Sequence, residues 1–186
     1  GISGGVGVRS GDALNSQAGD ITVMVGTGGS GEGGNLLLQA GSTSGAVDTA
    51  GDVVLTSGQS RVHDSGTVSI STPHAGLDSS ASSGDITVRT GATTFGNVGD
   101  INIEAGDNVA GQSGAISVVA GSGQLSDGGE LRLTSGTAAS ANSTSGIVQL
   151  TSGAGLVGAS TGSVELASGS GGVTGSVLLH TGSATA

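Results

Sequence analysis

The sequence Gly99-Asp100-Ile101-Asn102-Ile103-Glu104-Ala105-Gly106 carries the pattern that decides the fold. Two glycines enclose six residues in which aliphatic and other side chains alternate, and a small residue precedes the second glycine. Alternation with a period of two is typical of a short extended strand with one buried face. We call this eight-residue pattern the repeat segment.

The repeat segment recurs twelve times along the 186 residues, in steps of 13 to 18 residues. A glycine opens every segment, and a glycine closes all but one, in which Pro73 takes its place. Self-similarity at a short period indicates a repeat architecture, so residues 1–186 are predicted to form one continuous array. The two aliphatic positions of the segments form a predicted core ladder: Val6, Val8, Ile21, Val23, Leu36, Leu38, Val53, Leu55, Val68, Ile70, Ile86, Val88, Ile101, Ile103, Ile116, Val118, Leu131, Leu133, Val148, Leu150, Val164, Leu166, Val177 and Leu179.

The predicted fold class is all-β, a single parallel β-solenoid (β-helix) of about twelve coils of ~15 residues without helices. The longer steps are predicted to be insertions in the turns, as across residues 42–51 and 137–146. Antiparallel hairpins remain an alternative, although identical segments in one orientation favour parallel stacking. Turn glycines are predicted to occupy positive-φ or crowded positions: Gly19, Gly26, Gly51, Gly58, Gly84, Gly91, Gly99 and Gly106.

A second, weaker apolar column follows the first aliphatic position by eight or nine residues. It is predicted to face the core ladder across the interior of each coil, and the small residues before the closing glycines are predicted to line a narrow corner. The members of this second column are Leu14, Val62, Leu77, Phe95, Val109, Leu125, Val157 and Val173.

The composition excludes several classes of protein. The chain has 40 glycines but one proline, which does not fit collagen, and its fixed aliphatic register does not fit a flexible linker. Its net charge of −10 and its lack of lysine argue against binding to nucleic acid or to an anionic membrane surface. No apolar run is long enough for a membrane span, and the absence of cysteine excludes disulfides.

Few residues are candidates for chemistry. Asp20, Asp52, Asp85 and Asp100 share the position before the first aliphatic residue, and Asp85 and Asp100 fall on successive segments. We interpret this column chiefly as a solvated edge, with a weak calcium site at Asp85 and Asp100 as the alternative. No catalytic residue and no cofactor are predicted, and the three histidines are scattered along the chain.

A possible modification site lies in one of the longer turns. Asn142-Ser143-Thr144 matches the acceptor pattern for N-glycosylation, although a plain turn explains the same residues. Glycans are therefore possible partners of this chain.

The glycine-flanked segments, from Gly4 to Gly182, resemble the short-coil β-solenoid repeats of extracellular adhesins, cell-wall proteins and filament proteins. The resemblance implies a non-catalytic structural protein, extracellular or at the cell surface. Such a rigid segment would form or extend a filament, sheath or stalk by stacking coil on coil. The first and last segments look like the middle ones, so we expect either self-association end to end or laterally, or that these residues are an excerpt of a longer array.

The alternative function is an adhesin-like solenoid that binds a polysaccharide or an ice surface with one flat face. The position between the two aliphatic residues varies among glycine, threonine, leucine, serine, arginine and other residues, so it forms no regular threonine ladder. This irregularity argues against ice binding. An enzyme is the third and least favoured reading, because catalysis on a glycan needs a cleft as well as paired carboxylates.

Overall fold

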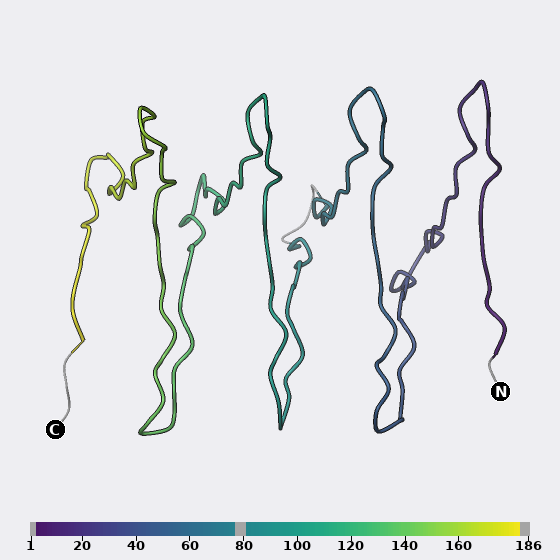
Figure 1. Cartoon of the computed structure of the whole chain (residues 1–186), viewed down its shortest axis with the longest axis horizontal. Helices are drawn as coiled ribbons and strands as arrows, with labels where there is room; N and C mark the ends of the chain where they lie inside the picture. Colours follow the sequence, from purple (N-terminus) through teal and green to yellow (C-terminus); the bar gives the residue numbers. More distant parts are fainter. Residues whose placement is uncertain (1–2, 77–80, 183–186) are drawn as a thin grey trace. The chain divides into compact units, whose positions relative to one another are not determined.

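The computed structural model describes residues 3–76 and 81–182, and within these ranges the chain contains neither helix nor strand (Figure 1). The prediction of an all-β parallel solenoid is therefore wrong, and so are the terms β-solenoid and β-helix for this chain. The described residues are largely irregular coil. The chain divides into two compact units, Gly1–Thr90 and Gly91–Ala186.

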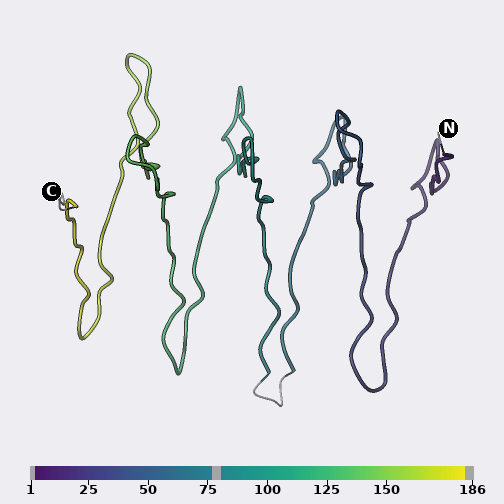
Figure 2. The same ribbon diagram turned by 90° about the horizontal axis from the view of Figure 1, so that it is seen from below.

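Extended repeat segments alternate with loops in both units (Figure 2). We call the stretch from the glycine that closes one segment to the glycine that opens the next a connecting loop. In several loops the opening glycine donates its N–H to the carbonyl oxygen of the closing glycine, at 2.8 to 3.1 Å. These pairs are Gly51 with Gly41, Gly66 with Gly58, Gly114 with Gly106, Gly129 with Gly121 and Gly146 with Gly136.

The same hydrogen bond closes loops of different lengths. Its two glycines are eight residues apart in loop 106–114 but ten residues apart in loops 41–51 and 136–146. The two steps of 17 residues are thus absorbed inside these connecting loops, which confirms that their insertions lie in the turns. The eight-residue segment itself keeps its length.

In most loops the small residue of a segment lies opposite the next opening glycine, although Val25 takes that place before Gly34 and a Cβ atom at Gly175 would meet nothing within 4 Å. A Cβ atom added to Gly114 would lie 3.1 Å from the Cβ of Ala105, and one added to Gly146 would lie 3.3 Å from the Cβ of Ser135. By contrast, a Cβ atom added to the closing glycine Gly106 would meet nothing within 4 Å. The opening glycine is therefore required by close approach, and the small residue provides the space for it.

Seven of the eight predicted turn glycines divide by what surrounds them, and the eighth, Gly99, opens its segment. Gly19, Gly51 and Gly84 open segments and approach the preceding segment, whereas Gly26, Gly58, Gly91 and Gly106 close segments in open space. In the described ranges, positive φ occurs only at Gly31, Gly96 and Gly158, all inside connecting loops, so the positive-φ part of the prediction is wrong for all eight.

The segments do not pair with one another, which is the physical reason that the predicted sheet is missing. All backbone–backbone hydrogen bonds between described residues span ten residues or fewer. Stacked coils would require bonds between residues about one repeat, roughly 15 positions, apart. Within the described ranges, the main chain of the six inner residues of a segment makes no hydrogen bond at all.

No described residue is buried, so the chain by itself has no core. Its accessible surface is 18,736 Å² for a mass of 17.2 kDa. A folded monomer of that mass would expose about 7,800 Å², and the unfolded chain about 25,000 Å². The single chain is therefore much closer in exposed area to an unfolded chain than to a globular domain.

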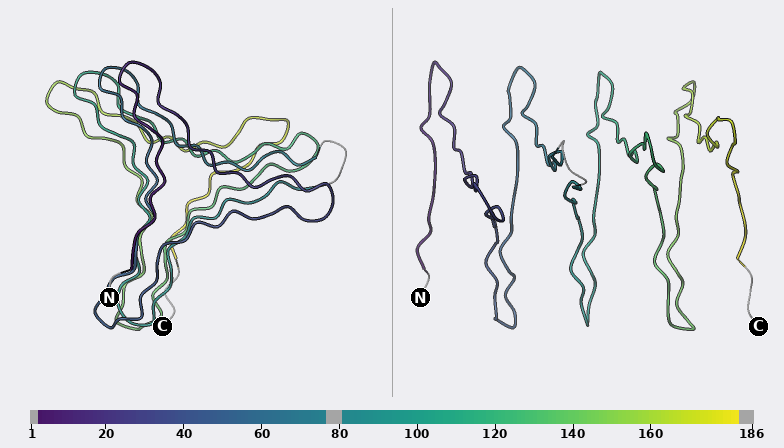
Figure 3. Two further views of the ribbon diagram at one scale, coloured as in Figure 1. Left: turned by 90° about the vertical axis from the view of Figure 1, so that its right-hand side faces the viewer. Right: turned by 180° about the vertical axis from the view of Figure 1, so that it is seen from behind.

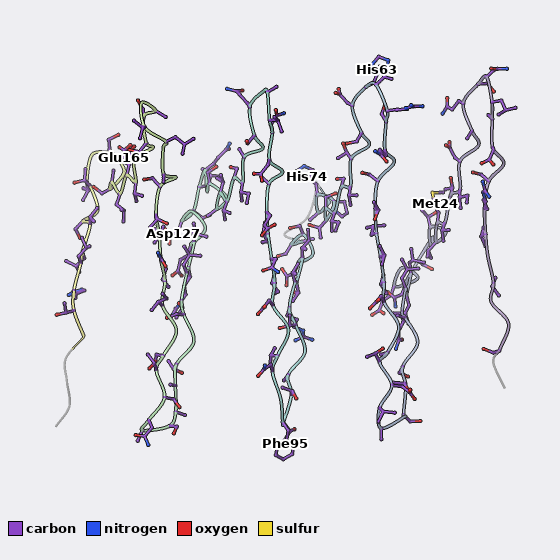
Figure 4. The ribbon with its side chains drawn as sticks, in the orientation of Figure 1. Met24, His63, His74, Phe95, Asp127 and Glu165 are labelled. Carbon is purple, nitrogen blue, oxygen red and sulfur yellow. The ribbon has the colours of Figure 1, made fainter. Side chains whose placement is uncertain are left out.

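The second apolar column does not face a core. Its described members lie within the connecting loops, and Leu14 and Phe95 are 98% and 91% exposed. Figure 4 shows Phe95 at the outer end of its loop. The predicted contact across each coil is therefore wrong, because these side chains lie on the connecting loops and remain exposed to solvent. Leu77 lies outside the described residues.

Candidate functional site

The exposed core ladder is the most extensive candidate site of the chain. All 24 aliphatic residues are between 46% and 97% exposed. In the segment quoted at the outset, Ile101 is 50% and Ile103 74% exposed, and because side chains two residues apart share one face, they form an apolar strip. Contiguous apolar surface of this kind marks a surface for interaction.

The backbone of each segment is exposed together with its aliphatic side chains. An extended segment whose N–H and C=O groups have no partner is a template for pairing with another extended chain. Each segment therefore offers two complementary features, an apolar strip and a row of free hydrogen-bonding groups. The alternation in the sequence predicts the apolar strip. It does not indicate that the strip remains exposed to solvent in the single chain.

The two carboxylates proposed for calcium are not brought together within either unit, because Asp85 belongs to the first unit and Asp100 to the second. Among the described residues, no group of three or more His, Asp or Glu side chains could hold a metal ion. His63 and His74 lie on different connecting loops of the first unit (Figure 4).

Asn142 lies in an exposed turn of connecting loop 136–146. The N–H of Ser143 donates to the carbonyl oxygen of Ser140 at 3.1 Å, which places Asn142 in the turn between them. The N–H of Ala138 donates to the side-chain oxygen of Ser145 at 3.1 Å, and the closing glycine pair forms the base of the loop. The geometry presents the Asn142 side chain to solvent, as an acceptor asparagine requires.

In other connecting loops, polar side chains form hydrogen bonds with the backbone of the same loop. The Asn108 Oδ1 atom accepts hydrogen bonds from the N–H groups of Ala110 and Gly111, at 2.7 and 2.5 Å. The Ser60 Oγ atom likewise accepts from the N–H of His63 at 3.0 Å. Asn and Ser form such local turns readily, so their presence in the loops was the available sequence signal for this role.

The ion pair formed by described residues joins Arg9 to Asp12 at 2.7 Å, and the guanidinium Nη2 donates to both carboxylate oxygens. Sequence reasoning did not single out this pair. Both side chains are about four-fifths exposed, so the pair contributes little to stability. It links the end of one segment to the start of the following loop.

The described residues enclose no pocket, and among them there is no helix of the length and apolar character that crossing a bilayer requires. A comparison with protein-family models, curated proteins and solved structures found no match to this chain. The exposed ladder is thus the feature on which a functional interpretation must be built.

Proposed function

We propose that this chain is a non-catalytic structural protein of the cell surface or extracellular space, whose repeat array builds a filament, sheath or stalk by self-association. The observation that carries the proposal is the uncovered core ladder, which repeats the same apolar strip twelve times. Stacking of coil on coil within one chain is not part of the proposal, because the segments of one chain do not pair.

The amount of exposed surface supports association along the whole array. The chain exposes about 11,000 Å² more than a folded monomer of its mass, whereas a standard interface buries roughly 800 Å² on each partner. An excess of this size corresponds to a missing core, and a single docking patch would not cover it. The partner must therefore contact nearly every segment.

The chemistry of the chain favours copies of itself as that partner. A partner must offer an apolar strip and free backbone groups at the same period, and the chain carries both features in all twelve segments. Its mean hydropathy is +0.19. Chains that remain unfolded in water have low hydrophobicity and a high net charge for their length, so this composition favours burial of the aliphatic strips between copies.

The location outside the cell rests on the resemblance of the segments to surface-protein repeats and on the exposed acceptor asparagine, Asn142. Attached glycans would lie on a connecting loop, away from the aliphatic strips, so modification and self-association are compatible.

The proposal is tested by sedimentation velocity and electron microscopy of the parent chain and two variants. Ile103→Asp places a charge on the apolar strip, whereas Asn102→Asp adds the same charge one residue earlier, on the opposite face of the segment. We expect assemblies for the parent and for Asn102→Asp, and at least tenfold weaker association for Ile103→Asp, because an unpaired charge cannot be buried at low cost. A parent chain that stays a 17.2 kDa monomer at about 100 μM would overturn the proposal.

A further inference from the structure

From the course of the chain within a unit, we propose that three copies wind around one another, with the repeat segments of each copy filling the spaces between those of the other two. The proposal rests on the self-association proposed above and specifies its partner, its stoichiometry and its register. The strips of Ile101 and Ile103, and of their counterparts, form the interface.

The first observation is the direction of successive connecting loops. Figure 3 shows that within the second unit the loops 106–114, 121–129 and 136–146 leave in three different directions. The next loop, 153–162, returns to the direction of the first. One round of the chain therefore takes three segments, and the fourth segment follows the same course as the first.

The second observation is that equivalent segments of successive rounds are not bonded to each other. Segments 99–106 and 146–153 are one round apart, and no backbone hydrogen bond joins described residues of the two. Their inner residues have free main-chain groups and exposed aliphatic side chains. Each segment is thus open along both edges, which an additional segment on each side would satisfy.

The third observation is a longer period in the sequence. Residues 1–65 align without a gap on residues 96–160, and 25 of these 65 positions are identical. Ninety-five residues contain six repeat segments, which is two complete rounds of three. Loops 26–34 and 121–129 share the ends Gly-Thr/Ser-Gly and Glu/Asp-Gly-Gly, so the loop sequences follow the rounds as well as the single segments.

A three-fold axis is the symmetry that fits a round of three segments. Successive segments of one chain differ in direction by about one third of a turn. A rotation of one third of a turn therefore places a segment of one copy along the same side as the preceding segment of another copy. Closed three-fold symmetry then lets three copies follow the same course around one axis. Segment 114–121 of a second copy and segment 129–136 of a third copy would then lie between segments 99–106 and 146–153 of the first.

The resulting register pairs every segment with its successor in another copy. All segments run in the same rotational sense, so neighbouring segments are parallel and about 4.8 Å apart, and one round rises about 14 Å. Ile101 and Ile103 of one copy would lie beside Ile116 and Val118 of the next. Aliphatic residues would meet aliphatic residues throughout, and the free backbone groups would find partners on both edges.

The absence of cysteine from the chain allows a direct test by engineered cross-links. In the intertwined trimer, positions 103 and 118 of different copies are neighbours at a spacing that a disulfide accepts, with Cα atoms 4.4–6.8 Å apart. The variant carrying Ile103→Cys and Val118→Cys should therefore oxidise to a covalent trimer of about 52 kDa, three times 17.2 kDa. Ile103→Cys with Leu133→Cys is the matched control, because those segments are two layers apart, about 10 Å.

The mass of the parent assembly from light scattering completes the test. A trimeric mass together with a covalent trimer from the 103/118 pair and none from the 103/133 pair is the expected result. A trimer in which the 103/118 pair does not link copies, or an assembly of another stoichiometry, overturns the intertwined arrangement and leaves self-association standing. A parent chain that remains monomeric overturns both proposals.

Discussion

Replacing Gly123 by alanine should damage one connecting loop specifically. A Cβ atom at this position would lie against the carbonyl oxygen of Ser126 and 2.6 Å from that of Asp127. A carbon atom approaches a carbonyl oxygen to no less than about 3.3 Å without strain, so the backbone of the loop must move. Both obstructing atoms belong to the main chain and cannot rotate away.

The expected cost follows from what the loop loses when it opens. Loop 121–129 is closed by the hydrogen bond from Gly129 to Gly121 at 2.8 Å, and losing that bond costs about 0.5–1.5 kcal/mol. With the strain that remains, Gly123→Ala should destabilise the assembled protein by about 1–3 kcal/mol. For a chain of this length, that corresponds to a melting temperature lower by roughly 2–12 °C.

Gly121→Ala is the matched control in the same loop. A Cβ atom at Gly121 meets nothing within 4 Å, and its φ is not positive. Alanine there should leave stability unchanged or raise it by about 0.4–1 kcal/mol, because it restricts the unfolded chain. Thermal denaturation at one fixed protein concentration measures both variants, and hydrogen exchange of the Gly129 amide reports on the loop itself. Equal melting temperatures and equal Gly129 exchange in the two variants would refute the loop geometry described above.

Three further predictions concern other parts of the chain. One residue inserted into loop 106–114 should be tolerated, whereas one residue inserted between Asn102 and Ile103 should abolish assembly by moving Ile103 to the opposite face of the segment, as size-exclusion chromatography would show; equal behaviour of the two contradicts the division into segments and loops. Asn142→Gln should remove one N-linked glycan from protein secreted by a glycosylating eukaryotic host, as mass spectrometry would show, and an unchanged mass refutes the site. Asp12→Asn should shift the melting temperature by less than about 2 °C, because its ion pair is exposed, and a larger shift means that the pair is buried in the assembly.

The sequence alone was sufficient to locate the segments and the loops. Alternation at Ile101 and Ile103 predicts an extended course, and the variable steps correctly assign the insertions to loops such as 136–146. The roles of the glycines were harder to predict, because a glycine column can mean positive φ or close approach. Their role became clear from hydrogen bonds such as that from Gly114 to Gly106, together with the close approach of Gly114 to Ala105, the small residue before the preceding closing glycine.

The error about the core has a different cause. Alternation with a period of two indicates that one face of a segment is buried, but it does not indicate whether the same chain or another chain buries it. Ile103 has the same neighbours in sequence whether its cover comes from the next coil of its own chain or from another copy. The missing information is the path of the connecting loops, which leaves no trace in the aliphatic pattern.

Each repeat therefore contains two sets of residues with different roles, one within the chain and one between copies. The pair of a small residue and an opening glycine, such as Ala105 and Gly114, closes a loop within one chain and sets the direction in which the next segment leaves. The aliphatic residues, such as Ile103, have no role within that chain, because they remain exposed. If the loops set the path and the aliphatic strips join the copies, substitutions of the first kind should change the shape of the assembly, and substitutions of the second kind should change its affinity.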